Sequence, residues 1–284
     1  MGQTTGISWT DATFNPWWGC WKIADECKNC YADATAHRYT SQFGELWGRT
    51  AGRRFFGDSH WAELAKWNRK AERDGVRMRV FVGSMCDWAE MHPDDAIALQ
   101  MANARERLWQ EIRECSSLDF LMLTKRPEDA AQLVPWARGE SYARDPWPNV
   151  WIGVTAGTRD TLRVNASILR SIPAVVRFIS CEPILEGIAA DEWDDAIGPG
   201  HGKIDWLIVG DESGPRARPA QVDWVRTARE AALRHGVAFH FKQWAGRDVA
   251  GIGGRLPSTG AGNARKIHLP TLDGKQWAQF PKEH

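Results

Sequence analysis

The sequence carries no excess charge of either sign, because its 36 Lys and Arg residues balance its 36 Asp and Glu residues. A chain without net charge has no overall electrostatic attraction to a polyanion. It also lacks an apolar run of the roughly 18 residues that a membrane-spanning helix needs, so we expect no membrane partner. The first residues lack the basic and apolar regions of a secretory signal, which predicts a cytoplasmic protein.

Internal repeats, low-complexity segments and a disordered composition are absent as well. The apolar and charged fractions, 43% and 25%, are ordinary for a globular protein. The length of 284 residues suits one large domain or two small ones and is ample for a sizeable core. Tyrosine is scarce, with three residues, whereas tryptophan is abundant, with 17. Trp offers a flat surface for stacking, but a Trp-rich core explains the same count.

Short β-branched and aromatic runs alternate with amphipathic stretches along the chain. Runs that are apolar at successive positions fit strands covered on both faces. We expect such strands at residues 79–83, 119–124, 150–155, 175–180, 204–209 and 237–242, with a shorter one near residues 14–18. Caps and apolar periodicity predict helices at residues 59–74, 94–114 and 219–235, and helices that begin near Tyr31, Pro127 and Thr158.

This βαβα order predicts an α/β protein with a partial (β/α) barrel of about six or seven mainly parallel strands. The barrel domain would span residues 1–244, with a cysteine loop near its start and a loop and helix insertion at about residues 42–78. Residues 245–284, which are Gly-rich and then polar, are expected to form a C-terminal extension. In such a barrel the functional site lies at the carboxyl ends of the strands.

Polar side chains follow nearly every expected strand. Any one of them can be an ordinary turn residue, but their repetition favours a site that hydrogen-bonds amines, hydroxyls and a carboxylate. The candidates include acids, a thiol and lysines: Ser84, Cys86, Asp87, Thr124, Lys125, Thr155, Glu182, Glu212 and Lys242.

Three of the six cysteines, Cys20, Cys27 and Cys30, fall within eleven positions. In a reducing cytosol they are expected to be thiols or metal ligands and not disulfides. Three interpretations stay open: ligands of a four-iron cluster with one iron left open, a zinc site with His37 as fourth ligand, or inert thiols. The strand-end residues favour the cluster, because an open iron at the barrel mouth needs such partners.

The segments ISWTDATFNPWWGC (residues 7–20) and CKNCYA (residues 27–32) resemble the phage Gp37/Gp68 family. That family consists of three-cysteine proteins related to radical S-adenosylmethionine (SAM) enzymes. The resemblance covers nearly the whole chain and continues through LTKRP (123–127), IGVT (152–155), SCEP (180–183), VGDESGP (209–215), FKQW (241–244) and LDGKQW (272–277). Six residues separate Cys20 from Cys27, a longer gap than in the usual radical SAM motif.

The resemblance implies a radical SAM-like partial barrel, a 4Fe-4S cluster on Cys20, Cys27 and Cys30, and SAM on its open iron. Such an enzyme cleaves SAM to a 5′-deoxyadenosyl radical, which abstracts hydrogen from a substrate. By their positions, Ser84 and Asp87 would hold the methionine end of SAM, Thr155 and Glu182 its ribose or amino group, and Lys125 its carboxylate. Thr124 and Glu212 would also bind the cofactor. Cys86, or alternatively Cys181, could return a hydrogen atom, and Lys242 is a further catalytic candidate.

The expected partners are an electron donor such as a flavodoxin or ferredoxin, and a DNA or RNA base or nucleotide as substrate. Nine basic and four acidic residues between Arg49 and Arg79, interleaved with aromatic residues, motivate the nucleic-acid hypothesis. A solvated helix face explains the same residues. The alternative function is a zinc-stabilised nucleic-acid-binding module without catalysis. The sequence does not specify an oligomeric state.

Overall fold

The computed structural model describes residues 5–137, 145–214, 216–244 and 270–282. Its centre is one sheet of seven parallel strands in the order β1-β4-β5-β6-β7-β8-β9. The predicted α/β class and partial (β/α) barrel are therefore confirmed. The strands are β1 (Ala12–Phe14), β4 (Met78–Val82), β5 (Leu118–Thr124), β6 (Val150–Thr155), β7 (Val176–Cys181), β8 (Trp206–Val209) and β9 (Ala238–Phe241).

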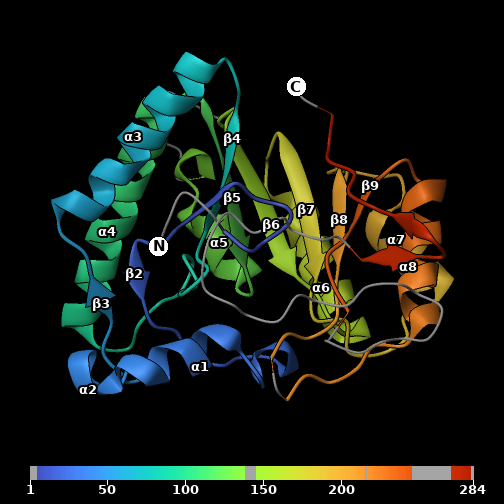
Figure 1. Cartoon of the computed structure of the whole chain (residues 1–284), viewed down its shortest axis with the longest axis horizontal. Coiled ribbons are helices and arrows are strands. Elements are labelled where there is room, and N and C mark those ends of the chain that lie inside the picture. The colour runs from blue at the N-terminus through green and yellow to red at the C-terminus, as the bar shows by residue number, and fades with distance from the viewer. Residues whose placement is uncertain (1–4, 138–144, 215, 245–269, 283–284) are drawn as a thin grey trace.

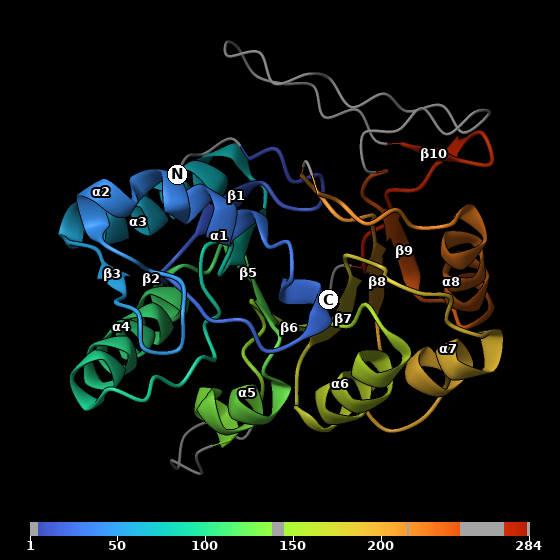
Figure 2. The same ribbon diagram turned by 90° about the horizontal axis from the view of Figure 1, so that it is seen from below.

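Helices supply the crossovers that parallel strands require. They follow one another around the outside of the curved sheet, as Figure 1 and, from the strand ends, Figure 2 show. They are α3 (Asp58–Asp74), α4 (Asp95–Glu114), α5 (Pro127–Leu133), α6 (Arg159–Ser171), α7 (Ala190–Ile197) and α8 (Val222–Arg234), with a short 3-10 helix at Pro135–Ala137 after α5. No helix in these described ranges is both long and apolar enough to span a membrane.

Local sequence signals fix several helix ends. The Asp94 side chain accepts a hydrogen bond from Ile97 N at 3.0 Å, which caps α4. Thr158 and Thr161 form a capping box at the start of α6. Pro127 occupies the first turn of α5, where its missing N–H costs nothing. These are the boundaries that the sequence predicts best.

Two local predictions differ from the structure. The strand expected near residues 14–18 ends at Phe14, because Pro16 has no N–H to continue a ladder. Beyond it, β2 (Trp17–Trp18) pairs antiparallel with β3 (Arg54–Phe55), outside the main sheet. Helix α7 was not predicted, because acidic residues interrupt the short apolar stripe of Trp193, Ala196 and Ile197.

The core has two layers, one on each face of the sheet. The larger layer packs the sheet against the surrounding helices. The smaller layer fills the inside of the barrel with aromatic and aliphatic side chains, among them Trp9, Phe81, Phe178 and Trp206. Trp9 lies edge-on to Trp206 with ring centres 6.3 Å apart. Most of the tryptophans are buried, so core packing accounts for their abundance.

The chain between β2 and β3 crosses the carboxyl ends of the strands. It contains two 3-10 turns, Asp25–Cys27 and His37–Tyr39, and the helices α1 (Tyr31–Ala36) and α2 (Thr40–Phe43). Figure 1 shows α1 and α2 below the ends of the strand arrows. This segment, which includes the start of the predicted insertion at residues 42–78, therefore lies over the barrel mouth.

The C-terminal extension predicted at residues 245–284 falls partly outside the described residues, which resume at residue 270. There β10 (Thr271–Leu272) and β11 (Lys275–Gln276) form a small antiparallel pair. Phe241 N then donates to Trp277 O at 2.9 Å, and Gln279 N donates to Phe239 O at 3.1 Å. The chain end thus pairs with the outer edge of β9, which removes an unpaired sheet edge.

Candidate functional site

A cavity open to solvent lies at the carboxyl ends of the strands beneath the cysteine loop (residues 20–30) and encloses about 1040 Å³ of empty space when the open solvent at its mouth is included. Its wall contains twelve of the site residues that the sequence predicts, but not the alternative candidates Cys181 and His37. The twelve are Cys20, Cys27, Cys30, Ser84, Cys86, Asp87, Thr124, Lys125, Thr155, Glu182, Glu212 and Lys242. The structure thus brings these residues together on one wall, and the contacts described below show what each side chain does there.

The cysteine loop carries its three thiols on three different local structures. Cys20 follows β2, Cys27 ends a 3-10 turn, and Cys30 is the cap residue of α1. All three are free thiols on the cavity wall. Within the described residues, no group of three His, Cys, Asp or Glu side chains is arranged to hold a single metal ion. A four-iron cluster makes a different demand, because each cysteine binds a different iron.

Hydrogen bonds with Glu212 and Arg218 fix the part of the cysteine loop between Asp25 and Asn29. Glu212 accepts hydrogen bonds from Asn29 Nδ2 and Arg218 Nε, both at 2.9 Å. Arg218 Nη2 also donates to the Asp25 carbonyl at 2.9 Å. Burial raises the pKa of Glu212, but the hydrogen bonds from Arg218 and Asn29 outweigh it and the net pKa is lowered. Glu212 therefore holds the loop, and its predicted role in cofactor binding stays a prediction.

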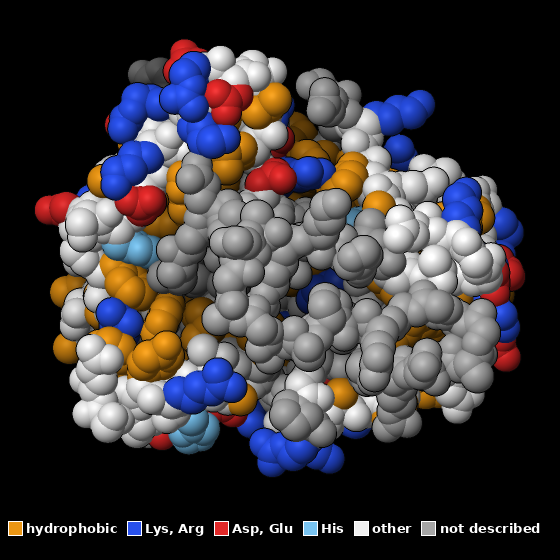
Figure 3. Space-filling model, in the orientation of Figure 1, with side chains coloured by type: hydrophobic (Ala, Val, Ile, Leu, Met, Phe, Trp, Pro, Cys, Tyr) orange, Lys and Arg blue, Asp and Glu red, His pale blue; other side chains and the backbone are white. Residues whose placement is uncertain are grey.

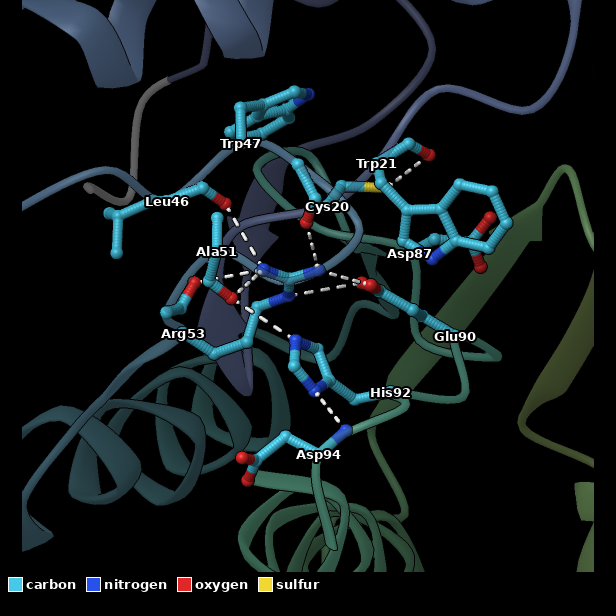
Figure 4. A network of polar contacts seen from close by, with 12 residues as sticks. Cys20, Trp21, Leu46, Trp47, Ala51, Arg53, Asp87, Glu90, His92 and Asp94 are labelled. Atoms are coloured by element: carbon cyan, nitrogen blue, oxygen red, sulfur yellow. Dashed lines mark hydrogen bonds and ion pairs between the residues drawn. The ribbon is translucent and has the colours of Figure 1, made fainter. Parts of the chain in front are cut away.

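The near end of the loop rests on a buried ion pair. The side chains of Arg53 and Glu90 are 0% exposed and form a salt bridge, shown in Figure 4. Arg53 Nη1 also donates to the carbonyls of Ala51 at 2.7 Å and Leu46 at 3.3 Å. Cys20 N in turn donates to Leu46 O at 3.3 Å. The buried guanidinium thus shapes the segment against which the Cys20 backbone lies.

Asp87 has no free oxygen to offer a ligand. Its carboxylate accepts from the Thr124 hydroxyl at 2.6 Å, from Lys125 N at 2.9 Å and from Arg126 Nη1 at 3.0 Å. It is 6% exposed, and Ala89 N donates to it as well. Asp87 and Thr124 therefore join the loop after β4 to the end of β5, and their contact with SAM stays a prediction.

The side chain of Lys125 takes no part in these contacts of Asp87. In the described part of the chain its ammonium has no hydrogen bond or ion pair, and it lies on the cavity wall. Burial lowers the pKa of Lys125, but negative charge at Cys27, Cys30, Asp87 and Cys20 raises it more, so the net pKa is raised. An ammonium held charged beside three thiols attracts an anion into the cavity.

The opposite wall carries a second ion pair. The Lys242 ammonium donates to Glu182, and the two side chains are 15% and 12% exposed. They come from the ends of β9 and β7, separated by Gly210, where an added Cβ would lie 3.3 Å from Glu182 Cγ. Thr155 is buried between these walls, and its hydroxyl has no partner among the described residues. These groups are placed to contact a polar ligand.

The two remaining thiol candidates lie on different faces of the sheet. Cys86 is on the cavity wall, and burial raises its pKa well above the ordinary range. Its neighbour Ser84 accepts a hydrogen bond from Asn15 Nδ2 at 2.9 Å. Cys181 instead packs in the layer beneath the helices. Cys181 is therefore excluded as a hydrogen donor in the cavity, while Cys86 stays a candidate.

His37 does not join the cysteines. Its side chain is 62% exposed and lies 3.7 Å from Asp33 and 3.8 Å from Glu45, outside the cavity wall. The zinc site with His37 as fourth ligand is therefore not formed.

The basic stretch between Arg49 and Arg79 is largely neutralised by acids. Arg53 is buried, Arg77 and Arg79 pair with Asp119 and Asp11, and on α3 Lys66, Lys70 and Arg73 pair with neighbouring carboxylates. Figure 3 shows basic and acidic side chains side by side over α3. Arg53, one of the nine basic residues that motivated the nucleic-acid hypothesis, is buried in an ion pair with Glu90 and does not face solvent.

Sequence reasoning missed several residues that shape the site. Arg126 was noted only as part of a motif, yet its Nη1 lies 3.7 Å from Cys20 Sγ. Glu26 was not singled out, although its buried carboxylate joins the cysteine loop to α6. Asn15 connects β1 to the loop of Ser84. The available sequence signals were that Glu26 precedes Cys27 and that Asn15 and Arg126 each follow a strand end.

No curated protein matches this sequence. A family model described as "Protein of unknown function (DUF5131)" matches residues 4–281, which is nearly the whole chain. The chain therefore belongs to the DUF5131 family.

Proposed function

We propose that this protein is an iron–sulfur enzyme of the radical SAM type. The observation that carries the proposal is the presence of three thiols of one loop and the free ammonium of Lys125 on the wall of one cavity. The cavity stands at the carboxyl ends of parallel strands, where enzymes with this architecture keep their active sites.

The donor set fits a four-iron cluster that is open at one corner. Three cysteines can bind three of the four irons, so one iron is left for a cofactor. Three thiolates bring negative charge, and Lys125 and the buried Arg126 are the cations beside them.

When bound, the cluster supplies the electron that cleaves SAM to the 5′-deoxyadenosyl radical, which removes hydrogen from the substrate. Lys125 would bind the SAM carboxylate, because it is the lysine on the wall with no carboxylate partner among the described residues. Thr155 and Glu182 would contact the ribose or amino group. An external flavodoxin- or ferredoxin-like protein would deliver the electron.

Cys86 is the candidate for returning hydrogen to the substrate. Burial keeps its thiol protonated, which is the form that can transfer a hydrogen atom. The external electron donor and a proton would then restore the thiol. Lys242, paired with Glu182 on the opposite wall, would orient the substrate.

The test is purification and reconstitution without oxygen, followed by iron, sulfide and zinc assays. We expect a brown protein with about four irons per chain. Cys20→Ala, Cys27→Ala and Cys30→Ala should each lose the cluster. Cys115→Ala is the matched control, because Cys115 is buried at the end of α4 and away from the cavity wall. Stoichiometric zinc without iron would overturn the proposal.

A further inference from the structure

We propose that Arg126 is a positioning residue that holds the Cys20 sulfur in place and makes the cluster easier to reduce. The inference rests on the proposed cluster, and it assigns a role to a residue that is not itself a ligand.

The Arg126 guanidinium bridges three groups. Nη1 lies 3.7 Å from Cys20 Sγ and 3.0 Å from Asp87 Oδ2, while Nη2 donates to the Trp21 carbonyl at 3.0 Å. The Arg126 side chain is only 6% exposed. One planar guanidinium therefore contacts both the Cys20 sulfur and the backbone carbonyl of the next residue, Trp21.

Asp87 sets the direction of that guanidinium. The two side chains form an ion pair, 6% and 7% exposed, between the ends of β5 and β4. Asp87 is itself fixed by the hydroxyl of Thr124 and the backbone N–H of Lys125. Charge-assisted hydrogen bonds in a buried setting are short and directional, so Arg126 has little freedom to turn away from Cys20.

The Cys20 backbone is anchored by a different set of contacts. Cys20 N donates to Leu46 O at 3.3 Å, and Gly48 N donates to Cys20 O at 2.9 Å. Figure 4 shows Arg53 and Glu90 locking the segment that supplies these groups. A change at Arg126 therefore removes the contacts with the Cys20 sulfur and the Trp21 carbonyl, and it leaves the backbone hydrogen bonds of Cys20 itself in place.

A positive charge beside a cluster thiolate stabilises the reduced form, which carries one more negative charge. Hydrogen bonds to the cysteine sulfurs act in the same direction and raise the reduction potential. Asp87 partly offsets the charge of Arg126. Removing the arginine should therefore make the potential more negative, whereas removing the aspartate charge should make it less negative.

The experiment compares midpoint potentials of the full-length, anaerobically reconstituted protein, measured by a redox titration followed by spectroscopy. We expect Arg126→Gln to shift the potential downward and Asp87→Asn to shift it upward. Arg126→Lys should give a smaller downward shift, because it keeps the positive charge but loses the planar guanidinium that donates through two nitrogens. A purely structural role for the pair would move both potentials in the same direction or not at all.

Two further variants control for folding and net charge. The double variant Arg126→Gln/Asp87→Asn removes both members of the buried pair, so no lone charge is left, and its potential should still lie below that of the wild type. Arg105→Gln removes another buried guanidinium, one that donates to the Trp88 and Glu90 carbonyls. It should shift the potential less than Arg126→Gln.

The possible failures are distinguishable. If the wild type binds a cluster but Arg126→Gln and the double variant keep its potential, the role of Arg126 is disproved and the proposed function stands. If the wild type takes up no cluster after reconstitution, the proposed function and this inference both fall.

Discussion

Glu26 in the cysteine loop accepts a hydrogen bond at 2.6 Å from Thr161, which lies in the first turn of α6. The same oxygen accepts from Gly157 N at 2.8 Å. A Cβ at Gly157 would lie 2.8 Å from Glu26 Cγ, so only glycine permits this approach. The contact spans the barrel mouth and fixes the loop segment that carries Cys27.

Loss of this contact should loosen the loop. We expect Glu26→Ala to cost about 1–3 kcal/mol of stability, because it removes the partner of the buried Gly157 N and the hydrogen bond from Thr161. It should also speed the loss of iron to a chelator from the reconstituted protein. Glu26→Gln keeps an acceptor and should retain most of both properties. Asp25→Ala is the control, because Arg218 contacts the Asp25 carbonyl and not its side chain. Equal iron loss in Glu26→Ala and wild type would disprove the docking role.

SAM affinity should depend on Lys125 more than on Asp87. A lost hydrogen bond to a charged group costs about 1.5–3 kcal/mol, so Lys125→Met should weaken SAM binding by roughly ten- to a hundredfold. Equilibrium binding to protein of matched iron content measures the effect. Lys28→Met, an exposed lysine of the same loop, should bind SAM like the wild type. Unchanged affinity in Lys125→Met would place the carboxylate elsewhere.

The sequence located the site because parallel strands bring their carboxyl ends to one edge. It could not choose between neighbouring residues on a strand without knowing the faces. Ser180 lines the cavity, whereas Cys181, one residue later, points to the opposite face, as strand alternation requires. The basic stretch in the sequence was also a misleading signal for a charged surface, because Arg53 pairs with Glu90, which lies 37 positions further along the chain. Only the fold shows that such a cation is buried and paired.

The protein should become less stable as the pH falls, because His240, a buried residue of β9, is neutral in the folded state. Its Nε2 lies 2.9 Å from Ser8 Oγ. Burial, with the charges of Arg79 and Lys242, lowers the pKa of His240 to about 3, from 6.5. The folded protein thus keeps His240 neutral, while the unfolded chain takes up a proton below about pH 6.5. The stability that depends on neutral His240 is present above that pH and is lost as pH falls toward 3.

Between pH 6.5 and pH 5 this effect should amount to about 2 kcal/mol, at 1.36 kcal/mol per pH unit. Denaturant unfolding at both pH values measures it. His240→Gln can still hydrogen-bond Ser8 but does not titrate, so its stability should change less over the same interval. An identical pH dependence in variant and wild type would show that other groups dominate acid unfolding.

We expect a nucleic-acid substrate to contact Arg54. Its guanidinium carbon lies 3.7 Å from the ring centre of Phe43, 4.8 Å from that of Trp18 and 5.0 Å from that of Phe56. Among the described residues Arg54 has no carboxylate partner, unlike most cations of the stretch between Arg49 and Arg79. Nearby Tyr39, whose ring centre is 6.0 Å from that of Trp18, is 42% exposed. Aromatic rings beside a cation that has no carboxylate partner are suited to stacking on unpaired bases.

We expect the protein to bind a single-stranded oligonucleotide at about 50 mM salt, with an affinity that falls steeply as salt rises. Arg54→Ala should weaken binding about tenfold, since a stacking contact with its charge is worth about 1–3 kcal/mol. Lys70→Ala is the matched control, because Lys70 on α3 is already paired with Asp74. Fluorescence anisotropy with labelled DNA and RNA measures all three proteins. Absence of binding at this salt concentration would exclude a nucleic-acid strand as substrate. It would leave a nucleotide, a peptide or a small metabolite to fill the space opposite Lys125.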